Sequence, residues 1–250
     1  MKTIIYLNND KYIAGMTLRD ETEPENSNMA LHVCKNPDDV IGNRKKLADY
    51  LNCSPDDFVC VNQTHGTNFY KATADDRGRG AYDAGTAIER TDAVYTCESG
   101  LLLCCFTADC VPVIFYNEQI AGVIHSGWLG TVNKITPKVL AHLINHEKCI
   151  PSDFHIYIGK AISQDRFEVD EDVFLRFKEL GYADDHIIYN SRAAKYHIDN
   201  QLVVKKQCEM AGIPADRIYV DRTCTYEDPA GFSYRRNKEC GRHMSFIIKK

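Results

Sequence analysis

Three short segments of the sequence carry side chains that bind metal ions or act as nucleophiles in proteins. They are Gln63–Gly66, Ala108–Pro112 and His125–Trp128. Each lies at the end of a run of residues that predicts a β-strand, and a side chain held there loses little entropy when it binds a ligand. A strand that ends at His125 beside one that starts after Cys110 would bring these two side chains together, with His65 as a candidate third donor. Buried structural residues are the competing interpretation.

Two imidazoles and one thiolate are the donor set of a metal site that keeps one position open. Zinc takes four tetrahedral ligands, and in catalytic sites a water molecule fills the fourth place. Water bound there has a pKa of about 7, so hydroxide is available at neutral pH. The same donors suit copper. His65, Cys110 and His125 therefore predict a zinc site, with copper as the alternative metal.

Two other interpretations of these residues need no metal ion. Cys110 as a nucleophile, with His125 as its base, would make a thiol hydrolase or amidase. A protein that only binds a partner, without turnover, is the other alternative. Measuring bound metal distinguishes the thiol hydrolase from a metalloenzyme, because the activity of a thiol hydrolase is insensitive to chelators.

A second group of polar residues lies near the C-terminus. Phe232–Arg236 and then Arg242 place guanidinium groups beside a serine and a tyrosine. Guanidinium matches the oxygens of an anion such as phosphate bidentately. A charged turn before the last strand is the competing interpretation.

The elements that position these residues are strands in the centre of the chain, with helices inserted at intervals. Apolar or β-branched runs bounded by turn residues predict strands at Thr3–Leu7, Phe58–Asn62, Ala93–Cys97, Leu101–Phe106, Pro112–Tyr116, Ile120–His125, Phe154–Ile158, Arg217–Val220 and Met244–Ile248. Capping residues and apolar spacing predict helices at Asn36–Tyr50, Thr131–His146, Asp170–Leu180 and Asp199–Ala211. Because strands and helices do not alternate strictly, we expect an α+β fold with central mixed β-sheets flanked by helices.

Composition limits the classes of protein to consider. The 250 residues are 44% hydrophobic and carry a net charge of −5, which argues for a globular chain and against a nucleic-acid binder that relies on positive charge. No composition shift divides residues 1–250, so one domain is expected. We find neither an apolar run of about 18 residues nor a secretory leader, and expect a cytoplasmic protein without a membrane span.

Two further features constrain the site. The 11 cysteines include no CxxC pair, so free thiols are expected and a structural four-cysteine zinc site is not. Residues 68–85 are rich in glycine, aspartate and arginine, but Asp83 breaks the GxGxxG pattern. We interpret this segment as a mobile surface loop, whose length suggests a role near a site.

Motifs spread along the whole chain resemble those of one bacterial family. The matching segments are Asn43–Leu47, Gln63–Gly66, Thr91–Ala93, Ala108–Pro112, Val123–Trp128, Phe167–Val169, Cys224–Thr225 and Phe232–Arg236. The chain resembles the YfiH family, also known as the multicopper polyphenol oxidoreductase (laccase-type) or purine nucleoside phosphorylase family. The resemblance implies a layered αβ domain in which His65, Cys110 and His125 bind a metal ion.

The resemblance also implies a set of activities. They are phosphorolysis of adenosine, inosine and methylthioadenosine, deamination of adenosine, oxidation of polyphenols and, in some members, peptidoglycan quality control. We predict a metal-dependent purine nucleoside phosphorylase with adenosine deaminase side activity, and keep the copper polyphenol oxidoreductase as an alternative. Its partners are then a purine nucleoside and phosphate, and the sequence leaves its oligomeric state open. Phosphorolysis requires a bound phosphate. By their charge, the candidate phosphate-binding residues are Arg44, Arg235 and Arg242.

Two positions depart from the family pattern. Leu129 follows the tryptophan where the family usually has arginine, and Lys160 replaces a proline. Loss of the arginine would weaken anion binding or alter the substrate. Lys160 is a candidate to restore that charge, although an ammonium group lacks the bidentate fork of guanidinium.

Overall fold

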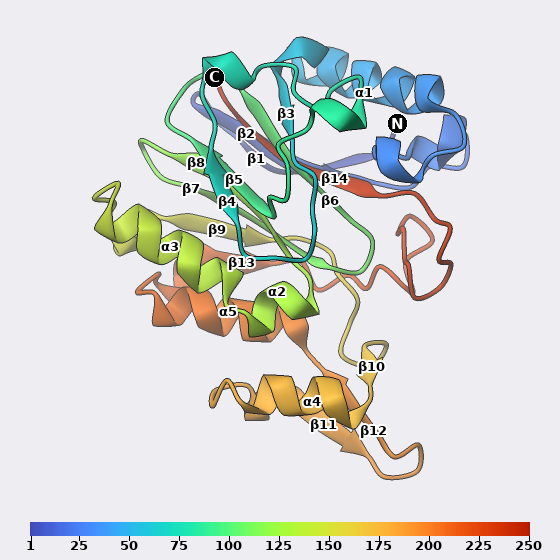
Figure 1. Cartoon of the computed structure of the whole chain (residues 1–250), viewed down its shortest axis with the longest axis vertical. Helices are drawn as coiled ribbons and strands as arrows, with labels where there is room; N and C mark the ends of the chain where they lie inside the picture. Colours follow the sequence, from blue (N-terminus) through green and yellow to red (C-terminus); the bar gives the residue numbers. More distant parts are fainter.

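Two β-sheets packed face to face form the centre of the computed structural model, which describes residues 1–250 (Figure 1). The first sheet has the order β1-β2-β14-β6-β3, with bounds Thr3–Asn8, Tyr12–Thr17, His243–Lys249, Leu102–Thr107 and Phe58–Cys60. The second has the order β13-β9-β7-β8-β5-β4, with bounds Ile218–Val220, His155–Ile158, Val111–Tyr116, Ala121–Ser126, Ala93–Thr96 and Phe69–Lys71. Both contain parallel and antiparallel pairs. The predicted α+β fold with mixed sheets is confirmed.

Helices cover the two outer faces. Helix α1 (Pro37–Leu51) packs on the first sheet, while α3 (Ile135–Asn145) and α5 (Asn200–Met210) pack on the second (Figure 1). The side chain of Asn36 accepts a hydrogen bond from the backbone of Asp38, as expected of the predicted N-cap.

The helix predicted at residues 131–146 is in fact two helices. Helix α2 (Trp128–Val132) ends before Lys134, where the backbone takes a φ of +63°, and α3 starts at Ile135. A left-handed residue cannot continue a right-handed helix, so Lys134 separates the two helices and the prediction of one continuous helix is wrong.

Strand β6 shows why the central strands read as continuous apolar runs. Leu102 and Cys104 point to the α1 side, whereas Leu103 and Cys105 point into the space between the sheets. Successive side chains in a strand face opposite ways, and here both faces are covered.

Residues 167–199 form a small lobe beside the paired sheets (Figure 1). Its elements are β10 (Glu168–Val169), α4 (Glu171–Lys178), β11 (Ile187–Asn190) and β12 (Lys195–Ile198), with the sheet order β10-β12-β11. Phe167 and Phe177 of the lobe share an apolar cluster with Val132 of α2 and Val203 of α5. The lobe is thereby packed against the end of the body that carries α2.

The glycine-rich segment of residues 68–85 begins with β4 of the second sheet, and its residues 78–80 lie against β3. A Cβ atom at Gly80, where φ is +70°, would come within 2.7 Å of Cys60. None of these residues lines the main cavity described below, so the expected role near the site is wrong. None of the helices combines the length and apolar character needed to cross a lipid bilayer.

Candidate metal centre

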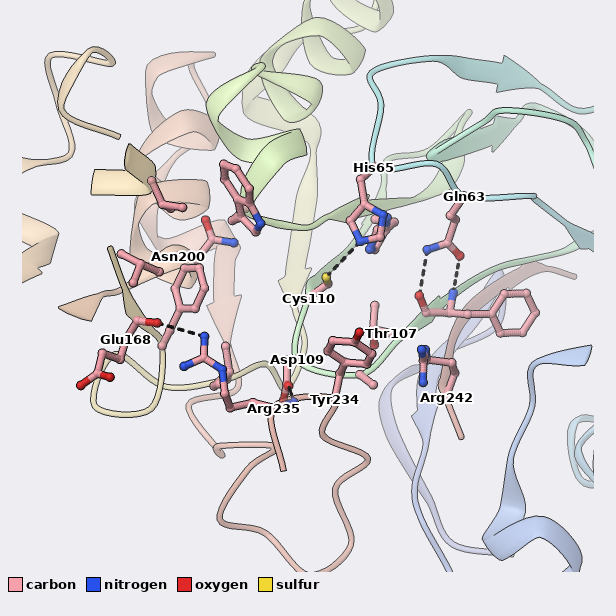
Figure 2. A pocket seen from close by; sticks show the side chains of 18 of the residues that line it. Gln63, His65, Thr107, Asp109, Cys110, Glu168, Asn200, Tyr234, Arg235 and Arg242 are labelled. Atoms are coloured by element: carbon pink, nitrogen blue, oxygen red, sulfur yellow. Dashed lines mark hydrogen bonds between the residues drawn. The ribbon is translucent and has the colours of Figure 1, made fainter. Parts of the chain in front are cut away.

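Cys110 and His125 are neighbours because β7 and β8 are antiparallel partners. Cys110 immediately precedes β7, and the pairing of Pro112 with His125 places it beside the end of β8. His65 comes from the turn after β3, with a φ of +57°. Its Nε2 lies 3.8 Å from the Cys110 Sγ, which points toward it in Figure 2. The predicted convergence is present, since the three donor atoms all lie within 4.8 Å of one another.

Asp92 holds two of these residues through one carboxylate. Its Oδ1 accepts hydrogen bonds from the His125 Nδ1 and from the backbone N–H of His65, both at 2.9 Å. Its Oδ2 accepts from the backbone N–H groups of Gly66 at 2.8 Å and Thr64 at 3.2 Å. Because a carboxylate accepts here, the Nδ1 of His125 carries a proton, and Nε2 is the nitrogen left to bind a metal ion once it gives up its own proton.

Gly127 leaves the space in which the donors approach each other. A Cβ atom at this position would lie 2.9 Å from the His65 Cδ2 and 3.0 Å from the Cys110 Sγ. His125 is 3% exposed, whereas His65 is open to solvent. The cluster is therefore closed by protein on one side and accessible on the other, which fits a three-ligand metal site with an open fourth position.

The charges of the cluster reinforce one another. Burial alone would raise the pKa of Cys110, but His125 and His65 outweigh it and lower this pKa to about 6. Burial alone would lower the pKa of His125, but Cys110 and Asp92 raise it to about 9. Cys110 is thus a thiolate at neutral pH, the form that binds metal ions and attacks electrophiles.

The cluster opens into a cavity of about 710 Å³ between the body and the lobe. Aromatic rings of Trp128, Phe167 and Tyr234 contribute to its wall, as do the guanidinium groups of Arg235 and Arg242. Figure 2 shows Arg235 on the side of Glu168 and Arg242 on the side of Gln63. A cavity with apolar walls and a few charged groups is the usual form of a small-molecule site.

The three predicted phosphate-binding arginines have different places. Arg44 is 2% exposed, and its guanidinium donates to the backbone carbonyls of Met29, Gly80 and Ala81. It is a structural residue outside the cavity, so its prediction as a phosphate ligand is wrong. Arg235 and Arg242 do line the cavity.

Arg235 also connects the C-terminal loop to the lobe. Its guanidinium donates to the carbonyl oxygens of Arg166 at 3.2 Å and Glu168 at 3.0 Å. Its backbone N–H donates to the carboxylate of Asp109 at 2.7 Å, and the hydroxyl of Ser233 donates to the same oxygen at 3.0 Å. Asp109 has a φ of +87° and precedes Cys110, so it joins this loop to the metal centre.

Lys160 and Leu129, the two departures from the family pattern, both lie outside the lining of the cavity. Lys160 is buried and donates to Asp228 at 2.7 Å, and it does not line the cavity. The idea that Lys160 restores a missing anion-binding charge is therefore wrong. Leu129 packs against the apolar cluster shared with the lobe.

Several residues around the centre carry little signal in the sequence. Asp92 was part of a matching motif, but a single aspartate before a strand has no spacing that reveals its partners. His32 and Asn200 line the cavity from segments far from the motifs. Only the folded chain brings them to the site.

Comparison with known proteins decides the family. A family model described as multi-copper polyphenol oxidoreductase laccase matches residues 16–250. The chain belongs to this family. It is 35% identical over 251 residues to the protein named purine nucleoside phosphorylase YlmD of Bacillus subtilis (strain 168), covering 97% of this chain and 90% of that protein.

Solved structures of this laccase-type family superpose closely on the chain. The crystal structure of a Bacillus licheniformis protein named YfiH has a TM-score of 0.91 at 34% identity, covering 96% of this chain and 93% of that one. The crystal structure of YlmD from Geobacillus stearothermophilus has a TM-score of 0.90 at 31% identity, covering 100% of both chains. The resemblance to the YfiH family is confirmed.

Proposed function

We propose that this chain is a metal-dependent purine nucleoside phosphorylase. The observation that carries the proposal is the convergence of His65, Cys110 and His125 at a cavity walled by aromatic rings and two arginines. The names of relatives that match over nearly the whole chain support the same activity. The substrates would be adenosine, inosine and methylthioadenosine, together with inorganic phosphate.

The metal ion would be held by the Nε2 atoms of His65 and His125 and the Sγ of Cys110. These donors and the space left by Gly127 fit zinc, and they also suit copper. When bound, such an ion acts as a Lewis acid that polarises an oxygen of a reactant. Asp92 fixes the tautomer of His125 that this binding requires.

The rest of the cavity would bind and orient the two reactants. The rings of Trp128, Phe167 and Tyr234 offer faces on which a purine stacks. Arg235 and Arg242 supply positive charge for phosphate. In phosphorolysis a phosphate oxygen forms a bond to C1′ of the ribose as the bond from C1′ to the base nitrogen breaks, and the base leaves with a proton. The products are a free purine and ribose 1-phosphate.

Product analysis tests this proposal. Metal-loaded protein is incubated with each nucleoside in the presence and absence of phosphate, and free base and ribose 1-phosphate are separated by chromatography. We expect free base only with phosphate, and its loss in the variants His65→Ala and Cys110→Ser. Release of ammonia and inosine from adenosine measures the deaminase activity that we propose as a side reaction. If fully metallated protein releases no base from any of the three nucleosides, the proposal is refuted.

A second candidate function rests on the order Cys110–His125–Asp92. The thiolate lies beside an imidazole whose other nitrogen is bound by a carboxylate at 2.9 Å, the arrangement of a cysteine hydrolase. This function predicts hydrolysis of amides or esters by metal-free protein and rapid loss of that activity when Cys110 is alkylated. A chelator abolishes the phosphorylase and leaves the hydrolase active, so one measurement separates them.

A further inference from the structure

Arg242 and His32 are two nitrogen-rich side chains of the cavity that retain unused hydrogen-bonding atoms. The Nη1 of Arg242 donates to the carbonyl oxygens of Cys240 at 2.5 Å and Gly241 at 3.1 Å. Its Nε and Nη2 donate to no protein oxygen, and neither ring nitrogen of His32 has a hydrogen-bond partner. Arg235, by comparison, already gives both Nη groups to backbone carbonyls. Arg242 therefore keeps more of its guanidinium free for a ligand than Arg235 does, and His32 keeps both ring nitrogens.

A buried asparagine builds this part of the cavity. The Oδ1 of Asn28 accepts hydrogen bonds from the backbone N–H of Arg242 at 2.8 Å and of Ala30 at 3.0 Å. Its Nδ2 donates to the carbonyl of Val33 at 3.1 Å, so both ends of the segment that carries His32 are fixed to it. Asn28 is fully buried, and a Cβ atom at Gly241 would lie 2.6 Å from its Cβ. The two chain segments are thus held together closely.

Aromatic rings contact the side chains of both His32 and Arg242. The His32 imidazole packs edge-on against the ring of Phe106, with 6.1 Å between centroids. The guanidinium carbon of Arg242 lies 5.8 Å from the centroid of Tyr234. Both side chains line the same cavity as Cys110, and Figure 2 shows the Arg242 guanidinium on the side of Gln63 and Thr107.

The charge around these residues is positive. The guanidinium carbon of Arg44 lies 5.2 Å from the ring centroid of Phe106. The positive charges of Arg242 and Arg44 both act on His32. Loss of hydration and these two arginines lower the pKa of His32. A doubly charged anion beside both groups would offset this repulsion and accept hydrogen bonds from the arginine fork and from the imidazole.

We propose that His32 and Arg242 form the binding site for a phosphate group in this cavity. The inference rests on the proposed function, in which this site holds the inorganic phosphate that attacks the nucleoside. Orthophosphate and the 5′-phosphate of a nucleotide share the same chemistry at this site. His32 then contacts a reactant directly, although no motif of the sequence pointed to it.

Binding measured without turnover tests the site. Inorganic phosphate and, separately, AMP are titrated by calorimetry into metal-loaded wild-type protein and into the variants Arg242→Gln, Arg242→Lys and His32→Gln. Each glutamine variant loses a hydrogen bond to a charged group and should therefore weaken phosphate binding by about 10-fold or more. Arg242→Lys should recover part of the affinity, since it keeps the charge without the fork. Arg192→Gln, an exposed arginine outside the cavity, is the matched control.

The outcomes separate the possible ligands and the two proposals. Weaker binding of inorganic phosphate in the glutamine variants, with unchanged metal content, supports a site for the reactant itself. Weaker binding of AMP alone supports a site for esterified phosphate. Wild-type affinities of both ligands in folded Arg242→Gln and His32→Gln proteins overturn the inference. A chain that binds phosphate at this site yet splits no nucleoside would contradict the proposed function and leave the site standing.

Discussion

Asp92→Asn tests whether one carboxylate organises the metal centre. The Asp92 carboxylate accepts from the His125 Nδ1, from the backbone N–H groups of Thr64, His65 and Gly66 and, at 3.4 Å, from the Thr64 hydroxyl. In the tautomer of His125 that binds a metal ion through Nε2, all of these partners except the hydroxyl can only donate. An asparagine of the same shape must turn its NH₂ toward some of them. Either His125 loses the acceptor that fixes its tautomer, or the turn that carries His65 loses hydrogen bonds from its backbone N–H groups.

The expected magnitude follows from the role of such partners. Removing the hydrogen-bond partner of a metal-binding histidine weakens metal affinity by about 10–100-fold. Asp92 is 0% exposed and anchors the His65 turn as well, so we expect the upper half of that range. Loss of buried bonds to a charged group should also lower the free energy of unfolding by about 1.5–3 kcal/mol.

Zinc affinity is measured by competition with a chromophoric chelator, and the sulfur-to-metal absorption of cobalt-loaded protein reports the geometry of the centre. Asp76→Asn is the matched control, because Asp76 is a buried carboxylate that caps the turn at Thr73 away from the cavity. The control should lose stability and keep its zinc affinity. Wild-type zinc affinity and an unchanged cobalt spectrum in folded Asp92→Asn protein would refute the reasoning.

Two more predictions concern Gly127 and His243. Gly127→Ala should reduce zinc affinity with little loss of stability, because a φ of −62° suits alanine while the new Cβ contacts His65 and Cys110. The same chelator assay measures this affinity. Gly42→Ala is the control and should leave zinc affinity unchanged, because no atom lies within 4 Å of its new Cβ. Burial lowers the pKa of His243 to about 4, and its neutral ring accepts from Phe232 and donates to Thr17. Because the unfolded pKa is about 6.5, the folded state should lose about 3 kcal/mol of stability as the pH falls from about 6.5 to 4. Urea unfolding of wild-type and His243→Gln protein at several pH values measures this, and a pH-independent difference between them would contradict it.

The parts of the fold that were predictable are those with strong local signals. Four β-branched or apolar runs separated by turn residues gave β5 to β8 nearly to the residue. The strands of the lobe escaped prediction because they are short and partly exposed, and because β12, besides its hairpin partner β11, pairs with β10, which lies 27 to 29 positions earlier in the chain. Such pairing depends on tertiary contacts that a local pattern does not contain.

The site was predictable where chemistry and strand ends coincide. His65, Cys110 and His125 were chosen by residue type and by their place beside strands, and the sheet brings them together. Arg44 was chosen by charge alone, and charge does not reveal that backbone carbonyls already occupy its guanidinium. Asp92 escaped prediction because its partners lie 26 to 33 positions away in the chain.

The lobe and the metal centre belong to separate parts of the chain, yet they face the same cavity. The three donors belong to the body formed by the paired sheets, whereas Phe167–Asp170, Asp172 and Val173 of the lobe form another part of the wall. Insertions, deletions or exchanges within residues 167–199 can therefore reshape the space available to a substrate while the donors stay in place. Descendants of one ancestral catalyst can in this way acquire new substrates without rebuilding the chemistry.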